Sequence, residues 1–287
     1  MVVAVDVGGT KIAAALVDAG GSIIRKVKLP TGTNAVSRVA EAARQVAPSW
    51  DGIRAVGVAI PGIYYAATGR VWAPNIPGWD HIPLRREIEA LLPVPIVVDS
   101  DRAACVLGEQ WKGVAQECTD VVFLAVGTGI GAGILSGGRL IRGASDIAGA
   151  VGWFALNPEM NETYRRVGCW EAESAGPGLA RRLGARNAEE VVEAARRGDA
   201  AALGAIEETA RYLGMGIANL ISVLNPQIVV LGGGLMQACD LMLDTIRREA
   251  HDWAQPIAAR QGRIELTQLG EDAALIGAAK LALDAIA

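Results

Sequence analysis

One pattern occurs twice along the chain: a strand, a glycine-rich turn, a second strand, a Gly-Gly turn and a third strand. The first copy covers Gly9–Arg25 and the second covers Gly127–Arg142, about 118 residues later. An apolar run precedes each copy, as expected for a β-hairpin whose first strand is buried. A repeat of this kind indicates two duplicated domains that open with the same three-stranded antiparallel sheet, with a boundary near residue 115.

Helices and further strands follow each hairpin unit. In the first half the pattern predicts helices over 34–46, 84–92 and 102–111 and strands over 53–60 and 96–98. In the second half it predicts a polar, glycine-interrupted stretch over 145–178, helices over 188–195, 201–224, 235–253 and 272–285, and strands over 227–231 and 264–266. This order predicts an α/β fold in which each domain has a mixed β-sheet flanked by helices, with ligands at the carboxyl ends of the strands. We expect domains over 1–115 and 116–271, with the C-terminal helix within 272–287 completing the first domain.

Composition and charge exclude several classes of protein. The 287 residues are 51% hydrophobic and include 35 glycines, which excludes a disordered or collagen-like chain. With 27 Lys and Arg against 31 Asp and Glu, the net charge of −4 leaves no positive excess for nucleic acid or an anionic membrane. No apolar run reaches the ~18 residues of a membrane span, no export signal is visible, and the four cysteines lack CxxC spacing. We therefore expect a cytoplasmic protein without a nucleic-acid or membrane partner.

Three glycine-rich turns follow predicted strands, at residues 8–11, 127–131 and 232–234. Glycine allows backbone N–H groups to approach a phosphate closely, and the neighbouring threonine hydroxyls and Lys11 add donors. Each turn alone is a weak signal, because most such turns only reverse the chain. Three of them at strand ends in two duplicated halves favour a shared phosphate-binding cleft between the domains. None matches a P-loop or a dinucleotide fingerprint, which disfavours both of those nucleotide-binding folds.

Three aspartates lie at predicted strand ends. Asp6 lies beside the first glycine turn, where its carboxylate could reach a magnesium-bound phosphate through water; the alternative is a strand-end aspartate that accepts from turn amides. Asp99 and Asp101 follow the strand 96–98 and, in an extended chain, would point to the same side. A carboxylate there could serve as base or orienting group toward a hydroxyl in phosphoryl transfer. The alternative is that one of them caps a helix from Arg102, which we favour for Asp99 and leave open for Asp101.

These motifs together resemble the ROK family of sugar kinases (repressor, open reading frame, kinase) within the actin-like ATPase superfamily. Residues 6–11 are similar to the first phosphate motif of that family, residues 127–131 to the second and residues 224–234 to the adenosine motif. Segments 73–79 and 168–177 resemble two further family segments. The resemblance covers nearly the whole chain.

The resemblance implies two actin-like (ribonuclease H-like) domains that close on ATP and Mg²⁺ in the cleft between them. It implies that Asp101 is the base that accepts a proton from a sugar hydroxyl, usually the primary one. Asn75 and Glu171 fall where the family hydrogen-bonds sugar hydroxyls, and Ser100 replaces the usual asparagine before the base. The residues expected to bind the nucleotide or its Mg²⁺ are Asp6, Gly8, Gly9, Thr10, Lys11, Gly127, Thr128, Gly129, Gly131, Gly232, Gly233 and Gly234.

The chain departs from the family where the C1/C2 end of a sugar binds. The usual Gly-Glu-x-Gly-His motif reads Gly-Ala-Val-Gly-Trp over residues 149–153, so the carboxylate and imidazole contacts are lost. The family's structural zinc uses a histidine of that segment and three cysteines, and at the cysteine positions this chain has Glu162, Tyr164 and Cys169. Because one cysteine does not make a tetrahedral site, we expect no zinc.

Trp153, at the position of the lost histidine, allows two interpretations. An indole there could stack on a sugar ring or close the C1/C2 pocket, which would select a ligand that is less polar or substituted at that end. It could instead fill the space of the missing zinc and pack with Phe154 and Trp170 as local core. We favour the second interpretation, and both could hold together.

The main hypothesis is an ATP-dependent kinase that transfers the γ-phosphate to a hydroxyl of a hexose-like sugar, a sugar modified at C1 or C2, or a cyclitol, and we expect the primary hydroxyl. Asp101, Asp6 and the three glycine turns support it, since only the C1/C2 contacts are replaced. The alternatives are a catalytically inactive nucleotide- or sugar-binding relative and an ordinary glucokinase or N-acylhexosamine kinase. No winged-helix segment precedes Met1, which disfavours the DNA-binding repressor branch of the family. Because family members are often dimers, we expect a homodimer.

Overall fold

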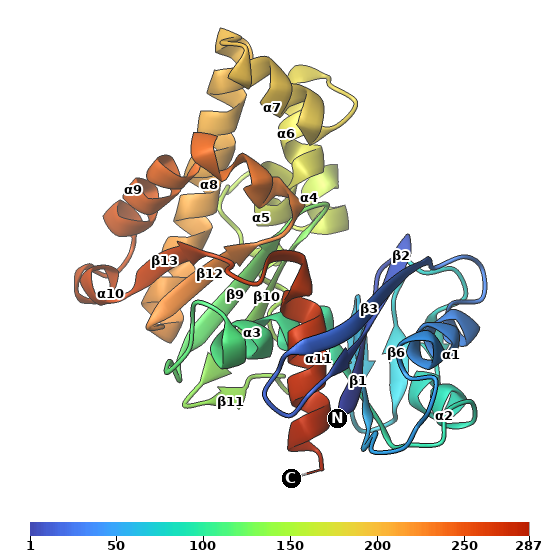
Figure 1. The fold of residues 1–287 in the computed structure, drawn as a ribbon. Coiled ribbons are helices and arrows are strands. Elements are labelled where there is room, and N and C mark those ends of the chain that lie inside the picture. The colour runs from blue at the N-terminus through green and yellow to red at the C-terminus, as the bar shows by residue number, and fades with distance from the viewer. Residues whose placement is uncertain (287) are drawn as a thin grey trace. The chain divides into compact units, whose positions relative to one another are not determined.

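The computed structural model describes residues 1–286, and the chain divides into two compact units (Figure 1). Unit 1 comprises Met1–Glu117, Arg142–Ala148 and the chain from Gln268 on. Unit 2 comprises Cys118–Ile141 and Gly149–Thr267. The segment 142–148 therefore belongs to unit 1, whereas the predicted division near residue 115 leaves it in the second domain.

Unit 1 is built on a five-stranded mixed sheet. The predicted hairpin unit is confirmed, because β1 (Val2–Val7), β2 (Lys11–Val17) and β3 (Ile23–Pro30) pair antiparallel in that order. β4 (Val56–Ile60) and β8 (Ile96–Ser100) extend the sheet in parallel to β1, which gives the order β3-β2-β1-β4-β8. The carboxyl ends of β1 and β8 therefore lie on the same edge of the sheet.

Alternation along β1 decides which side chains face which helices. Val3, Val5 and Val7 join the core formed with α1 (Ala35–Val46) and α2 (Leu84–Glu89). Since successive strand residues point to opposite faces, Asp6 faces the other side. That side is covered by α11 (Ala273–Asp284), which packs on β1 and β4 and also on α3 (Asp101–Lys112) (Figure 1). A short 3-10 helix, η3 (Gly270–Asp272), leads into α11.

A small antiparallel sheet lies in the segment that the sequence pattern describes only as a loop rich in Pro, Asn, Gly and Trp. It consists of β5 (Ile63–Tyr65), β6 (Arg70–Trp72) and β7 (Asp80–Ile82). Each strand has three residues, which is too short for apolar alternation to stand out in a sequence. The sheet follows β4 directly and leaves the loop with Asn75 between β6 and β7.

Unit 2 repeats the topology of unit 1. The strands β9 (Val121–Val126), β10 (Ile130–Ser136) and β11 (Arg139–Leu140) form the second copy of the hairpin unit. β12 (Ile228–Gly232) and β13 (Arg263–Leu266) add parallel strands in the order β11-β10-β9-β12-β13. The same strand order in both units confirms the α/β class and the duplication that the repeated pattern predicts.

Helices of unit 2 differ from the predicted ones in three places. The polar stretch predicted over 145–178 contains four short helices, and the helix predicted over 235–253 is two helices that meet at Met242. Residues 256–261 add a helix that the pattern does not predict. The elements are η1 (Val151–Trp153), α4 (Glu162–Val167), α5 (Cys169–Ser174), α6 (Gly176–Leu183), α7 (Ala188–Arg196), α8 (Ala200–Leu224), η2 (Gly234–Leu241), α9 (Leu243–Trp253) and α10 (Pro256–Gln261). Among residues 1–286, no helix is long and apolar enough to cross a membrane.

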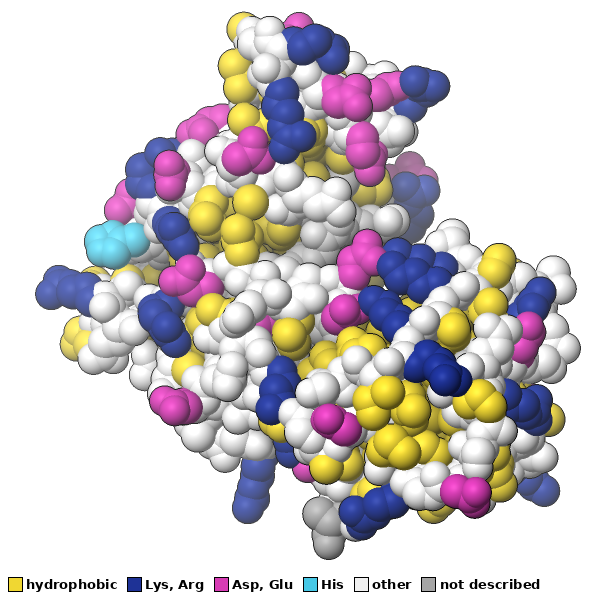
Figure 2. All heavy atoms as spheres, viewed as in Figure 1, with side chains coloured by type: hydrophobic (Ala, Val, Ile, Leu, Met, Phe, Trp, Pro, Cys, Tyr) yellow, Lys and Arg dark blue, Asp and Glu magenta, His cyan; other side chains and the backbone are white. Residues whose placement is uncertain are grey.

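Charged side chains of both signs are interspersed over the face drawn in Figure 2. On β2 and β3, Lys11 and Lys28 both lie close to Glu271, at 3.6 Å and 2.7 Å. All three side chains are largely exposed, so these pairs contribute little to stability. The mixture of signs agrees with the small net charge.

Candidate active site

The turn from β8 into α3 carries the predicted base. α3 begins at Asp101, and Ser100 is its N-cap, with the Ser100 Oγ accepting from the Ala103 amide at 3.2 Å. The interpretation that an aspartate caps a helix from Arg102 is therefore wrong, because the hydroxyl between the two aspartates takes that place. Asp101 lies in the first helical turn, where its negative charge is favoured by the helix dipole, and its Oδ1 accepts from the Arg102 amide at 2.8 Å.

Asp99 has a structural role, although not the predicted one. The residue is only 7% exposed, its Oδ1 accepts from the Ser100 amide at 2.8 Å, and its Oδ2 accepts from Nε and Nη2 of Arg142 at 3.1 and 2.6 Å. The two aspartates do not share an extended chain, because the backbone turns into the helix at Asp101. Asp99 is consequently a buried ion-pair partner rather than a second acid open to a ligand.

Asp6 lies at the end of β1 on the sheet face that also meets α3. Burial raises the pKa of Asp6 to about 7, with a further rise from the nearby charge of Asp101, while Lys11 and Lys26 act in the opposite direction. Burial also raises the pKa of Asp101, against the effect of the adjacent Arg102 guanidinium. The structure thus brings two predicted acids, Asp6 and Asp101, together in a place where a raised pKa disfavours the ionised form of both unless a cation is bound.

The first glycine turn of unit 1 is held closely by its surroundings. The Gly8 amide donates to the Lys11 carbonyl oxygen at 2.9 Å, and the Thr31 hydroxyl donates to the Gly8 carbonyl oxygen at 2.6 Å. A Cβ on Gly9 would lie 3.1 Å from the carbonyl oxygen of Asn75. The predicted sugar ligand Asn75 and the predicted phosphate turn therefore lie side by side, and Thr31, which sequence reasoning did not single out, supports the turn.

The second and third glycine turns open on one cavity of unit 2, with a volume of about 450 Å³. Gly127 and Thr128 of the second turn and Gly234 of the third turn line it. The Gly127 carbonyl oxygen accepts from the Gly176 amide at 2.8 Å, which holds the second turn to the start of α6. The remaining lining comes from the helices around it, namely Gly176, Pro177, Ala180, Arg186, Asn187, Ala188, Glu189, Val192, Glu193, Arg196, Leu235, Gln237 and Ala238.

The sequence does not predict the cavity residues of α6 and α7, nor those of η2 after Gly234, since only the fold brings them to the glycine turns. The Asn187 side chain caps α7 by accepting from the Glu190 amide at 3.0 Å, a local signal that marks the helix start but not its neighbours. Other predicted glycines serve packing. A Cβ on Gly232 would lie 2.5 Å from the Phe123 ring, Gly233 adopts a positive φ of 94°, and Gly131 of β10 pairs with Ala125 of β9.

Glu171 contacts the second glycine turn. Its Oε2 accepts from the Ile130 amide at 2.8 Å, and a Cβ on Gly129 would lie 2.7 Å from the same oxygen. A Cβ on Gly152 would lie 3.1 Å from it, so both glycines leave room for the carboxylate. Burial raises the pKa of Glu171, and the Ile130 amide opposes the rise. Glu171 therefore links the turn to the segment that carries Trp153.

Trp153 is 58% exposed, so the interpretation that it forms local core is wrong. Phe154 and Trp170 do stack, with ring centroids 5.6 Å apart and planes 7° apart, but Trp153 stays outside this pair. Trp170 is fully buried and donates from Nε1 to the Tyr212 carbonyl oxygen at 2.9 Å. The ligand-contacting interpretation of Trp153 stays a prediction.

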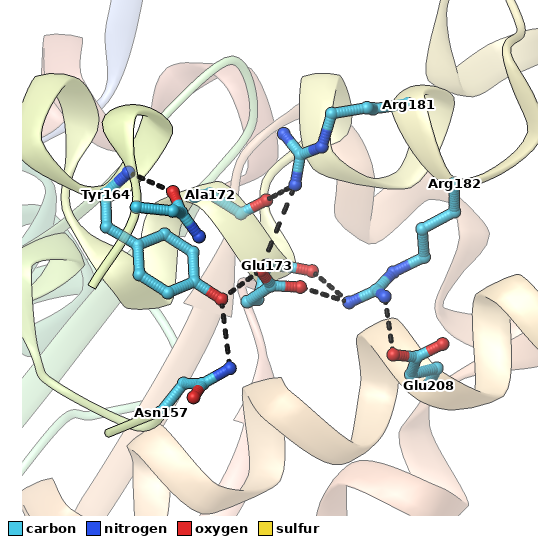
Figure 3. A network of polar contacts seen from close by, with 8 residues as sticks. Asn157, Tyr164, Ala172, Glu173, Arg181, Arg182 and Glu208 are labelled. Carbon is cyan, nitrogen blue, oxygen red and sulfur yellow. Dashed lines mark hydrogen bonds and ion pairs between the residues drawn. The ribbon is translucent and has the colours of Figure 1, made fainter. Parts of the chain in front are cut away.

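The segment with Glu162, Tyr164 and Cys169 contains a polar network (Figure 3). The Tyr164 hydroxyl donates to Glu173 at 2.5 Å and accepts from Asn157 at 3.4 Å. Glu173 also accepts from Arg182 at 2.8 Å, and the same guanidinium donates to Glu208 at 2.6 Å. Burial raises the pKa of Tyr164, and the Glu173 carboxylate adds to the rise. Tyr164 is thus engaged within the protein, and the absence of zinc stays a prediction.

Two α/β units with the same strand order, glycine turns at their strand ends and paired acids define a phosphate-handling protein of the actin-like kind. The ROK family model matches residues 2–285, so the chain belongs to the ROK family. A glucokinase of Halalkalibacterium halodurans is 32% identical over 96% of this chain and 92% of its own. An N-acetylmannosamine kinase of Escherichia fergusonii is 33% identical over 97% of each chain.

The same conclusion follows from a solved structure. A ROK family glucokinase from Streptomyces griseus, solved in complex with glucose and AMPPNP, is 32% identical, has a TM-score of 0.81 and covers 99% of both chains. The predicted family and the predicted two-domain actin-like fold are therefore confirmed.

Proposed function

We propose that this protein is an ATP-dependent sugar kinase in which Asp101 is the general base. The observation that carries the proposal is the pairing of Asp101 with Asp6 at the carboxyl ends of β8 and β1. The cavity beside the second and third glycine turns supports it as the place for the nucleoside. The kinase relatives and the glucokinase complex with AMPPNP agree with this assignment.

In the proposed reaction the Asp101 carboxylate accepts the proton of an acceptor hydroxyl. The hydroxyl oxygen then bonds to the γ-phosphorus of ATP, the bond from that phosphorus to the β–γ bridging oxygen breaks, and ADP leaves. Because the Arg102 amide occupies Oδ1 of Asp101, Oδ2 is the oxygen that remains for the proton. The glycine turns and Lys11 would bind the phosphates.

The carboxylate oxygens of Asp6 are suitable ligands for Mg²⁺, which prefers one or two carboxylates together with water and phosphate. Two neighbouring acids of raised pKa also form a site where a cation relieves unfavourable charge. Mg²⁺ would neutralise charge on the β- and γ-phosphates. We propose that Asp6 holds it through water.

The acceptor would contact Asn75, Ser100, Glu171 and Trp153. The Ser100 oxygen already accepts from Ala103, so its hydroxyl proton is what it offers a ligand. We propose a sugar modified at C1 or C2, or a cyclitol, because the exposed Trp153 offers an apolar face at that end. An Ala150→Glu, Trp153→His double variant should shift preference toward glucose, and an unchanged preference would contradict this acceptor class.

The kinase proposal is tested by ADP release with ATP, Mg²⁺ and a panel of hexoses, aminosugars and cyclitols. We expect turnover with at least one acceptor, and an Asp101→Asn variant that is about 10²–10⁴-fold slower. Asp252→Asn, at an exposed position of α9, is the matched control. If AMPPNP binds but no acceptor releases ADP, the inactive-relative alternative replaces the proposal. Turnover of glucose or N-acetylmannosamine alone would favour an ordinary hexose or N-acylhexosamine kinase.

We also propose that the protein is a cytoplasmic homodimer without a nucleic-acid partner. The net charge of −4 supports the last point, since phosphate-backbone binding draws on excess Lys and Arg. Light scattering of the purified chain would measure its mass against the 29.9 kDa of one copy. A mass of one copy at micromolar concentration would contradict the dimer.

A further inference from the structure

The ion pair between Arg142 and Asp99 joins parts of the chain that are 43 residues apart. Asp99 is buried, while Arg142 is 44% exposed along its side chain and donates two hydrogen bonds to one oxygen of Asp99. The chain leaves unit 2 after Ile141, contributes residues 142–148 to unit 1, and returns to unit 2 at Gly149. We refer to residues 142–148 as the strap.

Hydrogen bonds lead from Arg142 to the turn that carries the proposed base. Arg142 fixes Oδ2 of Asp99, and Oδ1 of Asp99 accepts from the Ser100 amide. Ser100 in turn caps α3, whose first residue is Asp101. The position of the Asp101 carboxylate therefore depends on a turn that Arg142 holds from outside the strand and the helix.

A second contact anchors the strap. Asp146 has a positive φ of 59°, and its side chain accepts from the Ala66 amide at 3.0 Å. The Ala148 amide donates to the Arg142 carbonyl oxygen at 3.0 Å, which closes the strap into a loop. Ala66 follows β5, and the preceding Gly62 carbonyl oxygen accepts from Arg102 Nη2 at 3.1 Å. Both ends of the strap thus meet segments that contact the base-bearing turn.

We propose that Arg142 is a positioning residue for Asp101, an inference that rests on the proposed kinase function. Removing one partner of a buried ion pair leaves an uncompensated charge, which moves or takes up a proton. Loss of the two hydrogen bonds to Oδ2 of Asp99 also releases the turn at Ser100, whether or not Asp99 keeps its charge. A displacement of about 1 Å at a reacting group can cost about 10²-fold in rate. Nucleotide binding involves other residues and should be unaffected.

Arg142→Gln is the test, with Arg142→Lys as the conservative variant and Arg139→Gln, an exposed position of β11, as the control. We expect kcat to fall about 10–10²-fold in Arg142→Gln, while its KM for ATP stays within about twofold of the wild-type value. Arg142→Lys should recover part of the lost kcat. Arg139→Gln should match the wild type. An Arg142→Gln enzyme with unchanged kcat, or one whose kcat and ATP affinity fall together, would overturn the inference.

Two further experiments cover an Arg142→Gln variant that does not fold and a wild type without kinase activity. If Arg142→Gln does not fold, the Asp99→Asn, Arg142→Gln double variant, which lacks the uncompensated charge, takes its place: a retained loss of kcat supports the inference and a wild-type kcat overturns it. If the wild type has no kinase activity, the proposed function fails. The inference is then tested by the carboxyl ¹³C chemical shift of Asp101, measured as a function of pH. We expect the midpoint of this titration to differ between Arg142→Gln and Arg139→Gln, and superimposable curves would overturn the inference. The ionisable groups beside Asp101 that both variants retain are Asp6, Arg102 and Cys105.

Discussion

Gly277 of α11 lies directly against the Ala104 carbonyl oxygen of α3, so that a Cβ on Gly277 would overlap with that oxygen. The same kind of contact occurs where Gly108 of α3 faces the Ala273 carbonyl oxygen. These glycines allow α11 to pack closely on α3, the helix that carries Asp101. The C-terminal helix thereby supports the base-bearing element from the far end of the sequence.

Gly277→Ala should destabilise unit 1, because α11 must move away from α3 to admit the methyl group. We expect a loss of about 1–3 kcal/mol in the free energy of unfolding, measured by urea denaturation. Gly204→Ala is the control, since a Cβ there meets open space within α8 and should stabilise the helix by about 0.5–1 kcal/mol. Equal unfolding curves for Gly277→Ala and the wild type would contradict the close packing.

Asp6 predicts a pH dependence of stability. Its pKa of about 7 in the folded chain exceeds the ordinary 3.8, so between these values the folded state keeps a proton that the unfolded state has released. The free energy of unfolding should therefore fall as pH rises from about 4 to about 7 and level off above that range. Asp6→Asn should remove this part of the pH dependence. A difference curve between the two proteins that stays flat would show that Asp6 is not perturbed.

Trp153 and Trp170 should respond in opposite ways to truncation. Trp170 is fully buried in the core of unit 2, so Trp170→Ala should cost about 3–5 kcal/mol of stability. Trp153→Ala should change stability by no more than about 0.5 kcal/mol, because the side chain is exposed. Its effect should instead be a raised KM for the acceptor. A melting temperature that drops equally in both variants would return Trp153 to the core.

Tyr164→Phe should weaken the network of Figure 3. The hydroxyl is a donor to Glu173, and its loss leaves a buried carboxylate with fewer partners. We expect a cost of about 1–3 kcal/mol in thermal or urea unfolding. Tyr65→Phe serves as the comparison, since Tyr65 contacts His81 through its ring, and it should be close to neutral. A neutral Tyr164→Phe would mean that Arg181 and Arg182 together satisfy Glu173.

The strands of the two large sheets, the glycine turns and the duplication could be predicted from the sequence, because apolar alternation and turn chemistry act between residues that are near neighbours in the chain. The family could be identified for the same reason, since its motifs are short and keep their order. The short strands of residues 63–82 were missed because three residues do not establish a period.

Only the tertiary structure decided which charges and cavities come together. That Arg142 neutralises Asp99, that α7 lines the cavity beside Gly127, and that Trp153 is exposed while Trp170 is buried all depend on chain segments tens of residues apart. Burial and ion pairing are properties of those encounters, and a residue type by itself does not determine its partner. The sequence alone determined the fold class and the set of acids and glycines, and the packing of distant segments determined what each of them contacts.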